Sequence, residues 1–139
     1  MATLTANKIL DSGFSSSMAT CTPAGDEFSN TGVEFIRIQN GHASVAYTVK
    51  IVAATTTVKH PSYGNLTKSD IYKSVSSSGS TNSNDIILGP FKQGAFNDVN
   101  NKVQISYCAT AVATAAAFGS ASAISGSHLL KIEVLYLDN

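Results

Sequence analysis

The chain has 139 residues, of which 43% are hydrophobic and 13% charged, and its nine basic and nine acidic residues leave no formal net charge. The length suits one domain of roughly 100–200 residues, and the hydrophobic content excludes a wholly disordered chain. A neutral chain is not typical of a nucleic-acid binder, and no stretch reaches the roughly 18 apolar residues of a membrane helix. We therefore expect neither nucleic acid nor membrane as a partner.

Residues 1–24 hold few apolar side chains in a setting rich in Ser, Thr and Ala, and they include Leu4, Ile9, Leu10 and Phe14. This composition predicts an extended N-terminal arm whose apolar anchors pack against another subunit or against the chain's own domain. The alternative is a first edge strand with a loose end. The opening residues lack the basic start and apolar block of a signal peptide, so we expect no export.

Apolar and polar residues alternate along several short runs, which is the pattern of half-buried β-strands. Residues 33–39 and 44–52 are two such runs, and Asn40-Gly41 between them is a strong turn signal, so they are predicted to form a hairpin. A loop of Ser, Gly, Thr and Asn is predicted over residues 76–84. Further strands are predicted over residues 70–75, 85–88, 103–108 and 129–137.

The Ala-rich stretch 109–123 is ambiguous, because alanine favours helix while its Thr, Val and Gly residues do not. No amphipathic period is present, and we favour a strand over 111–115 followed by a loop over 119–127. Several short strands separated by turns predict an all-β fold. We expect an antiparallel β-sandwich or jelly-roll-like barrel over residues 25–139, preceded by the extended arm of residues 1–24.

The chain contains residue types that catalyse reactions or bind metals, but they do not have the spacing of a known catalytic or metal-binding motif. Asp26 and Glu27 are adjacent, so on an extended chain they point to opposite faces, and a turn before the strand at residue 33 explains them better than catalysis. His42, His60 and His128 are far apart in polar surroundings and are expected to be exposed, with convergence on zinc as the alternative. The chain has neither a nucleophile elbow nor a phosphate-binding loop. We expect no enzyme activity, no cofactor and no metal.

The cysteines and tyrosines are interpreted mainly as packing residues. Cys21 and Cys108 are far apart, and two buried thiols are favoured over a disulfide. Four of the five tyrosines lie in strand patterns, where aromatic residues are expected from packing alone. Tyr63 lies in the loop His60–Gly64, and it is the tyrosine expected to be exposed and available for contact.

Three further segments of the sequence form a recognisable layout. They are Met1–Ile9, Gly25–Gly32 with the strand ending at Asn40, and Leu88-Gly89-Pro90-Phe91 with Phe96-Asn97-Asp98 and a strand bearing Val103, Ile105 and Tyr107. Together these segments resemble small head proteins of tailed bacteriophages, in particular capsid decoration (cement) proteins. The stretch from about 55 to 84 and the Ala-rich segment depart from that layout.

The resemblance implies a β-sandwich subunit on the outside of a virus shell, which binds the major capsid protein and itself, as a homotrimer, and stabilises the shell against the pressure of packed DNA. It would be a virion structural protein, made in the host cytoplasm and located at the capsid surface. The alternative is a tail or fibre adhesin that binds host-surface glycan or protein through Tyr63 and the 76–84 loop. Candidate contact residues are Leu4, Ile9, Leu10, Phe14 and Tyr63.

Overall fold

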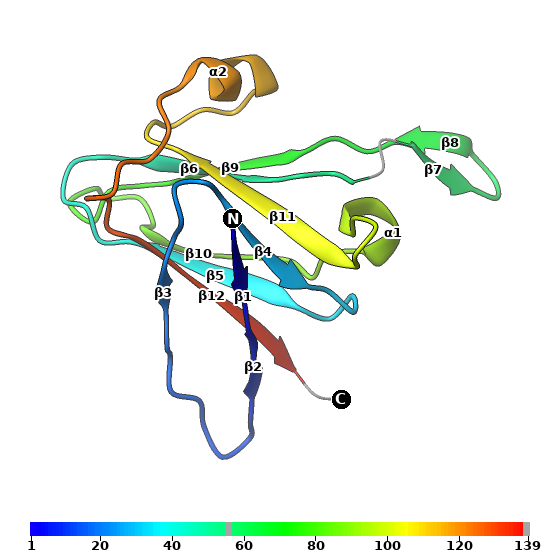
Figure 1. Cartoon of the computed structure of the whole chain (residues 1–139), viewed down its shortest axis with the longest axis horizontal. Coiled ribbons are helices and arrows are strands. Elements are labelled where there is room, and N and C mark those ends of the chain that lie inside the picture. The colour runs from blue at the N-terminus through cyan, green and yellow to red at the C-terminus, as the bar shows by residue number, and fades with distance from the viewer. Residues whose placement is uncertain (55–56, 138–139) are drawn as a thin grey trace.

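The computed structural model describes residues 1–54 and 57–137, and these residues confirm the all-β class (Figure 1). The first sheet has the strand order β1-β4-β11-β6-β9. In this sheet β1 pairs with β4 in parallel. The other pairs of neighbouring strands, β4 with β11, β11 with β6 and β6 with β9, are antiparallel. These strands are β1 (Ala2–Leu4), β4 (Asp26–Ser29), β6 (Tyr47–Ile51), β9 (Ile71–Val75) and β11 (Lys102–Cys108).

The second sheet has the order β10-β5-β12-β2, and the short β3 also pairs with β12. Its β2 is parallel to β12, so both sheets are mixed and not antiparallel as expected. The parallel pairs arise because residues 1–24 add strands to sheets that are otherwise antiparallel, and in the described residues neither sheet closes into a barrel. These strands are β2 (Ala6–Ile9), β3 (Ala19–Thr20), β5 (Phe35–Asn40), β10 (Asp85–Leu88) and β12 (Leu130–Leu137).

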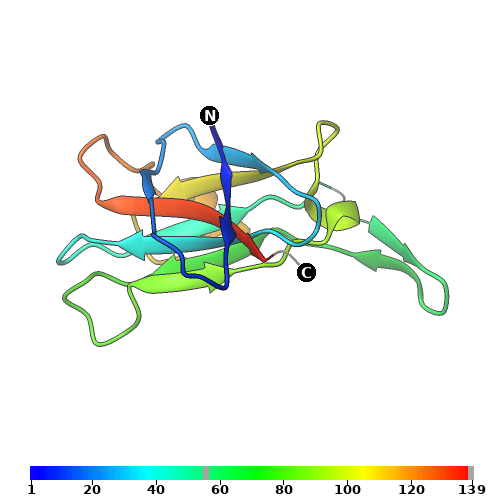
Figure 2. The ribbon, with the colours of Figure 1, turned by 90° about the horizontal axis from the view of Figure 1, so that it is seen from below.

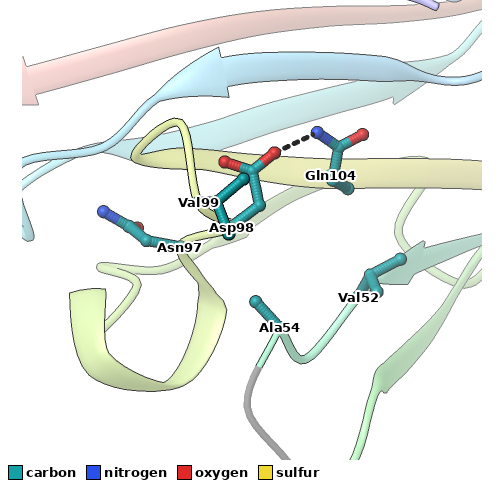
Figure 3. A pocket seen from close by; sticks show the side chains of 6 residues that line it. All are labelled: Val52, Ala54, Asn97, Asp98, Val99 and Gln104. Carbon is teal, nitrogen blue, oxygen red and sulfur yellow. Dashed lines mark hydrogen bonds between the residues drawn. The ribbon is translucent and has the colours of Figure 1, made fainter.

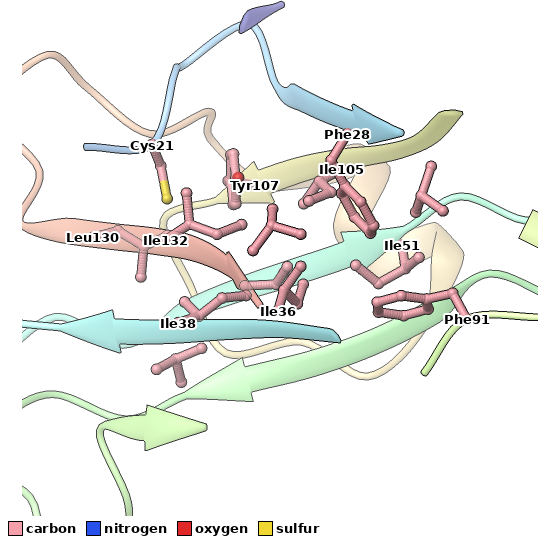
Figure 4. Close-up of a cluster of buried hydrophobic side chains, with 14 of the residues drawn as sticks. Cys21, Phe28, Ile36, Ile38, Ile51, Phe91, Ile105, Tyr107, Leu130 and Ile132 are labelled. Carbon is pink, nitrogen blue, oxygen red and sulfur yellow. The ribbon is translucent and has the colours of Figure 1, made fainter. Parts of the chain in front are cut away.

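The inward faces of both sheets contribute to one hydrophobic cluster (Figure 4). Alternation within each strand produces it: Phe35, Arg37 and Gln39 of β5 are part-exposed, whereas Ile36 and Ile38 are fully buried. Full burial of each such side chain stabilises the fold by about 1.5–3 kcal/mol. The fully buried members from the two sheets include Phe28, Val49, Ile51, Val103, Ile105, Ile36, Ile38, Leu130, Ile132 and Val134.

The hairpin predicted from residues 33–39 and 44–52 is wrong, because β5 and β6 belong to different sheets. Both strands bury their alternating apolar residues in the same core, so the chain crosses from one sheet to the other between them. Asn40, fully buried, fixes this crossing. Its Nδ2 donates to the carbonyls of Val45 (2.8 Å) and Ser76 (2.9 Å), and its Oδ1 accepts from the backbone N–H of His42 (2.9 Å).

The predicted strand over 111–115 is also wrong, and the stretch instead contains the short helix α2 (Ala115–Ser120). Thr114 caps this helix by accepting from the Ala117 N–H (3.3 Å), and alanine has the best helix propensity of any residue. The segment lies over the outer face of the first sheet, where Thr48, fully buried, donates to the carbonyl of Thr110 (2.7 Å). The ring of Phe118 packs against Tyr72.

The other predicted strands and the 76–84 loop are confirmed to within a residue or two. A two-stranded ribbon was not predicted from the sequence; it consists of β7 (Thr57–His60) and β8 (Gly64–Thr67), whose strands pair with each other in the described chain. Figures 1 and 2 show this ribbon extending away from both sheets, beyond the short helix α1 (Gln93–Phe96).

Candidate functional site

The N-terminal segment lies along the edges of both sheets, so its expected anchors pack against its own chain. Leu4 is half-buried against the core, and Ile9 and Phe14 are also half-buried. Leu10 stays 50% exposed at a turn in which the Gly13 N–H donates to the Leu10 carbonyl (3.0 Å). Of these four residues, Leu10 is therefore the one that the fold leaves most available to a partner.

A buried carboxylate fastens this segment to the second sheet. Glu133 of β12 is charged but only 3% exposed, and Ser16 and Ser17 of the N-terminal segment both donate to its carboxylate. Its Oε1 accepts from Ser16 Oγ (2.8 Å) and Arg37 Nη1 (3.2 Å), and its Oε2 accepts from the Ser17 N–H (3.1 Å). Arg37 also donates to Asp85, and these hydrogen bonds raise the pKa of the guanidinium above its ordinary value.

The adjacent carboxylates do point to opposite faces, but they lie in strand β4 and not in the turn that was expected. Asp26 is fully buried, and its Oδ2 accepts from the Tyr107 hydroxyl (2.7 Å) and the Thr22 N–H (3.0 Å). Burial raises the pKa of the neighbouring Cys21 thiol to about 12. Cys21 and Cys108 are free and buried, as expected. This inner group ties β4 to β11 beneath the surface.

Glu27, on the other face of β4, belongs to a surface ion pair. Its Oε1 accepts from Lys102 Nζ and from Thr3 Oγ1 (2.8 Å), and its Oε2 accepts from Gln104 Nε2 (3.0 Å). The hydrogen bond from Lys102 is the main reason why the pKa of Glu27 falls to about 2. Because the donors come from β1 and β11, this carboxylate joins three neighbouring strands of the first sheet.

Two of the three histidines lie against one tyrosine at the end of the molecule where β5 crosses to β6. The rings of His42 and His128 are centred 6.3 Å and 6.4 Å from that of Tyr47. His128 is 5% exposed, so its expected exposure is wrong. Its Nδ1 accepts the Leu130 N–H (3.2 Å), while the side chain of His60 lies outside the described residues. Among the residues the structure describes, no three His, Cys, Asp or Glu side chains gather as a metal site.

The tip of the β7–β8 ribbon carries the aromatic residue singled out by sequence. Tyr63 is 77% exposed, as predicted. Tyr47 and Tyr107 are buried, and Tyr72 and Tyr136 are half-buried in strands, as strand patterning predicted. An exposed aromatic ring on a projecting ribbon offers a large apolar contact area together with a polar hydroxyl.

A cleft of about 390 Å³, which was not predicted from the sequence, lies at the base of the ribbon (Figure 3). The Asp98 carboxylate at its edge accepts from the backbone N–H groups of Asn100 (2.8 Å) and Lys102 (3.0 Å) and from Gln104 Nε2 (2.9 Å). These bonds lower the pKa of Asp98, with the backbone bond from Lys102 contributing most. The cleft is lined by Val52, Ala54, Asn97, Asp98, Val99 and Gln104.

The exposed ribbon tip, the cleft at its base and Leu10 together form the candidate contact features of this molecule. Val99 at the cleft is 98% exposed, so an apolar side chain stands beside the fixed Asp98 carboxylate. No helix among residues 1–54 and 57–137 is long and apolar enough to cross a membrane. Comparison of the chain with models of protein families, with curated proteins and with solved structures found no match.

Proposed function

We propose that this protein is a virion structural protein, a decoration (cement) protein of a tailed bacteriophage that binds the major capsid protein and further copies of itself. The observation that carries this proposal is the β7–β8 ribbon, which extends from both sheets and presents Tyr63 (Figures 1 and 2). A two-stranded ribbon alone is marginally stable in water. A partner surface that receives the ribbon adds packing around it.

The body of the molecule is suited to withstanding mechanical force, as this proposal requires. Its two sheets, arranged as a β-sandwich around one core, resist deformation because protein interiors are close-packed. Glu133 and Glu27 fasten residues 1–24 to both sheets, which joins the first segment of the chain to the last strand. A force applied at the surface is thus spread across the β-ladders of both sheets.

The charge balance supports dense assembly on a shell. A net charge of zero removes the electrostatic repulsion that keeps strongly charged proteins apart in solution. Many copies on one lattice also gain from multivalency, because each bound site raises the effective concentration at the next. Contacts that are individually weak then hold neighbouring capsomers together against internal pressure.

Co-sedimentation with isolated particles tests the proposal. Purified chain is mixed with expanded, undecorated heads and, separately, with tails of the phage that encodes it. We expect saturable binding to heads and a higher temperature of head disruption. Tyr63→Ala is expected to weaken binding at least tenfold, while Ile87→Ala, which trims a 62% exposed side chain on β10, serves as the matched control. Absence of binding to heads would contradict the proposal.

The second candidate is a tail or fibre adhesin, and the exposed ring of Tyr63 also favours it, because sugar rings stack on exposed aromatic faces. The two candidates differ in location on the particle and in target. An adhesin would bind tails and host cells, and Tyr63→Ala would abolish cell binding. Binding to heads without binding to cells favours decoration.

A further inference from the structure

We propose that the ribbon tip of one copy docks into the cleft at the base of the ribbon of a second copy, with Lys59 of the ribbon approaching Asp98 of the cleft. This inference rests on the proposed function, since it identifies the surfaces by which a decoration protein would bind itself. The docking surface comprises Lys59 and Tyr63 on one copy and Val52, Ala54, Asp98 and Val99 on the other.

Charge is the first argument for a second copy as the occupant. Between residues 52 and 69 the sequence contains no acidic residue, and it contains Lys59 and Lys68. Lys68 Nζ lies 4.8 Å from the centre of the Phe96 ring of its own chain, whereas Lys59 is exposed on β7. The ribbon therefore presents positive charge, and the cleft edge presents the carboxylate of Asp98.

The Asp98 carboxylate is positioned to form an ion pair with a cationic side chain of another molecule. In the described part of the chain, Asp98 has no Lys, Arg or His ion-pair partner, whereas Glu27 nearby is paired with Lys102. Three N–H donors hold Asp98 in place, and a carboxylate has about four acceptor positions, so room remains for one further donor. A fixed acceptor loses little entropy on binding, which favours association.

Shape and apolar area form the second argument. Val52, Ala54 and Val99 give the cleft apolar walls, and Figure 3 shows Val52 and Ala54 projecting toward the Asp98 loop. Val99 is 98% exposed and Tyr63 is 77% exposed, so each would gain from burial against the other copy. Aromatic anchors in clefts of this kind supply much of the binding energy at interfaces.

The contact is heterologous, because a ribbon meets a cleft and not a second ribbon. A heterologous contact generates a closed ring of copies where the rotation between neighbours closes, and an open filament where it does not. Ala54 of the cleft lies three residues before the start of β7, so the ribbon and the cleft lie at the same end of the molecule, and both contacts of each copy would gather around one axis. In this arrangement each site is incomplete without a residue from the neighbouring copy.

Charge reversal tests the docking, with sedimentation velocity of the full chain over a range of concentrations as the readout. We expect wild type to self-associate, and Lys59→Glu and Asp98→Lys each to lower the association constant at least tenfold. An equimolar mixture of K59E and D98K should recover association, because the ribbon of the first then meets the cleft of the second with opposite charges. Lys131→Glu and Asp11→Lys, at exposed positions outside this surface, are the matched controls and should associate as wild type does.

Either of two outcomes would overturn the docking: a monomeric wild type at every concentration, or an oligomer that K59E and D98K leave intact. If Asp98→Lys fails to fold, Asp98→Asn removes the charge and keeps an oxygen acceptor, and it should still weaken association. Head binding separates this inference from the proposed function. If the protein is monomeric but still binds heads, only the docking is contradicted. If it self-associates through this contact but does not bind heads, only the proposed decoration function is contradicted.

Discussion

Asn40→Ala is the most informative perturbation of the fold, because this side chain decides where β5 leaves the second sheet. The substitution removes donors to the carbonyls of Val45 and Ser76 and a weaker one to Val75 (3.3 Å), together with the acceptor for the His42 N–H. A net loss of about 1 kcal/mol per hydrogen bond, and more where a partner stays buried and unpaired, sums to about 3–5 kcal/mol. That is a large share of the roughly 5–15 kcal/mol that stabilises a typical domain.

Urea unfolding followed by circular dichroism measures the effect. For an m-value near 2 kcal/mol/M, the unfolding midpoint should fall by roughly 2 M. Asn40→Asp should be at least as damaging, because it replaces the amide donor with an acceptor that faces carbonyl oxygens. Asn82→Ala, in the exposed 76–84 loop, is the matched control and should shift stability by less than about 0.5 kcal/mol. If Asn40→Ala and Asn82→Ala unfold alike, the buried crossing is not what holds the two sheets in place.

Further predictions concern the core, a titrating pair and the thiols. Ile51→Ala, at a fully buried position, should cost about 2–4 kcal/mol by urea unfolding, and an unchanged midpoint would mean that the site is not packed. Because its pKa is lowered from 4.5 to about 2 in the folded chain, Glu27 stabilises the fold above pH 4.5 and loses this contribution as the pH falls toward 2. Glu27→Gln should therefore show a shallower loss of stability over that range, and an identical profile would refute the pairing. Cys21 and Cys108 should react slowly with Ellman's reagent in the native protein and fully after unfolding, and fast native reaction would contradict their burial.

The strands themselves were predictable from sequence, because a strand with one buried face repeats its apolar residues every second position. The pairing of β5 with β6 was not, because the same pattern arises whether two strands lie side by side or face each other across a core. Asn40-Gly41 was interpreted as a hairpin turn, and what the sequence could not show was that the Asn40 amide lies in the core. The one sequence feature that indicated this was the position of Asn40, a polar residue where the alternating pattern of β5 places an inward-facing side chain.

The candidate surface was predicted in part. Tyr63 was expected to be exposed from its loop setting, and it is. The cleft was missed because its walls come from residues 52–54 and 97–104, which the fold brings together from distant parts of the sequence. The buried state of Glu133 was missed for the same reason, since its partners at residues 16–17 lie more than 110 positions away.

Electron cryomicroscopy of the virion is the decisive experiment, because the proposed function includes a defined location on the particle. We expect ordered density of this fold on the outer surface of the head, with ribbons directed toward neighbouring copies or capsomers. Density of this fold at the tail tip, or a particle from which the protein is absent, would contradict it.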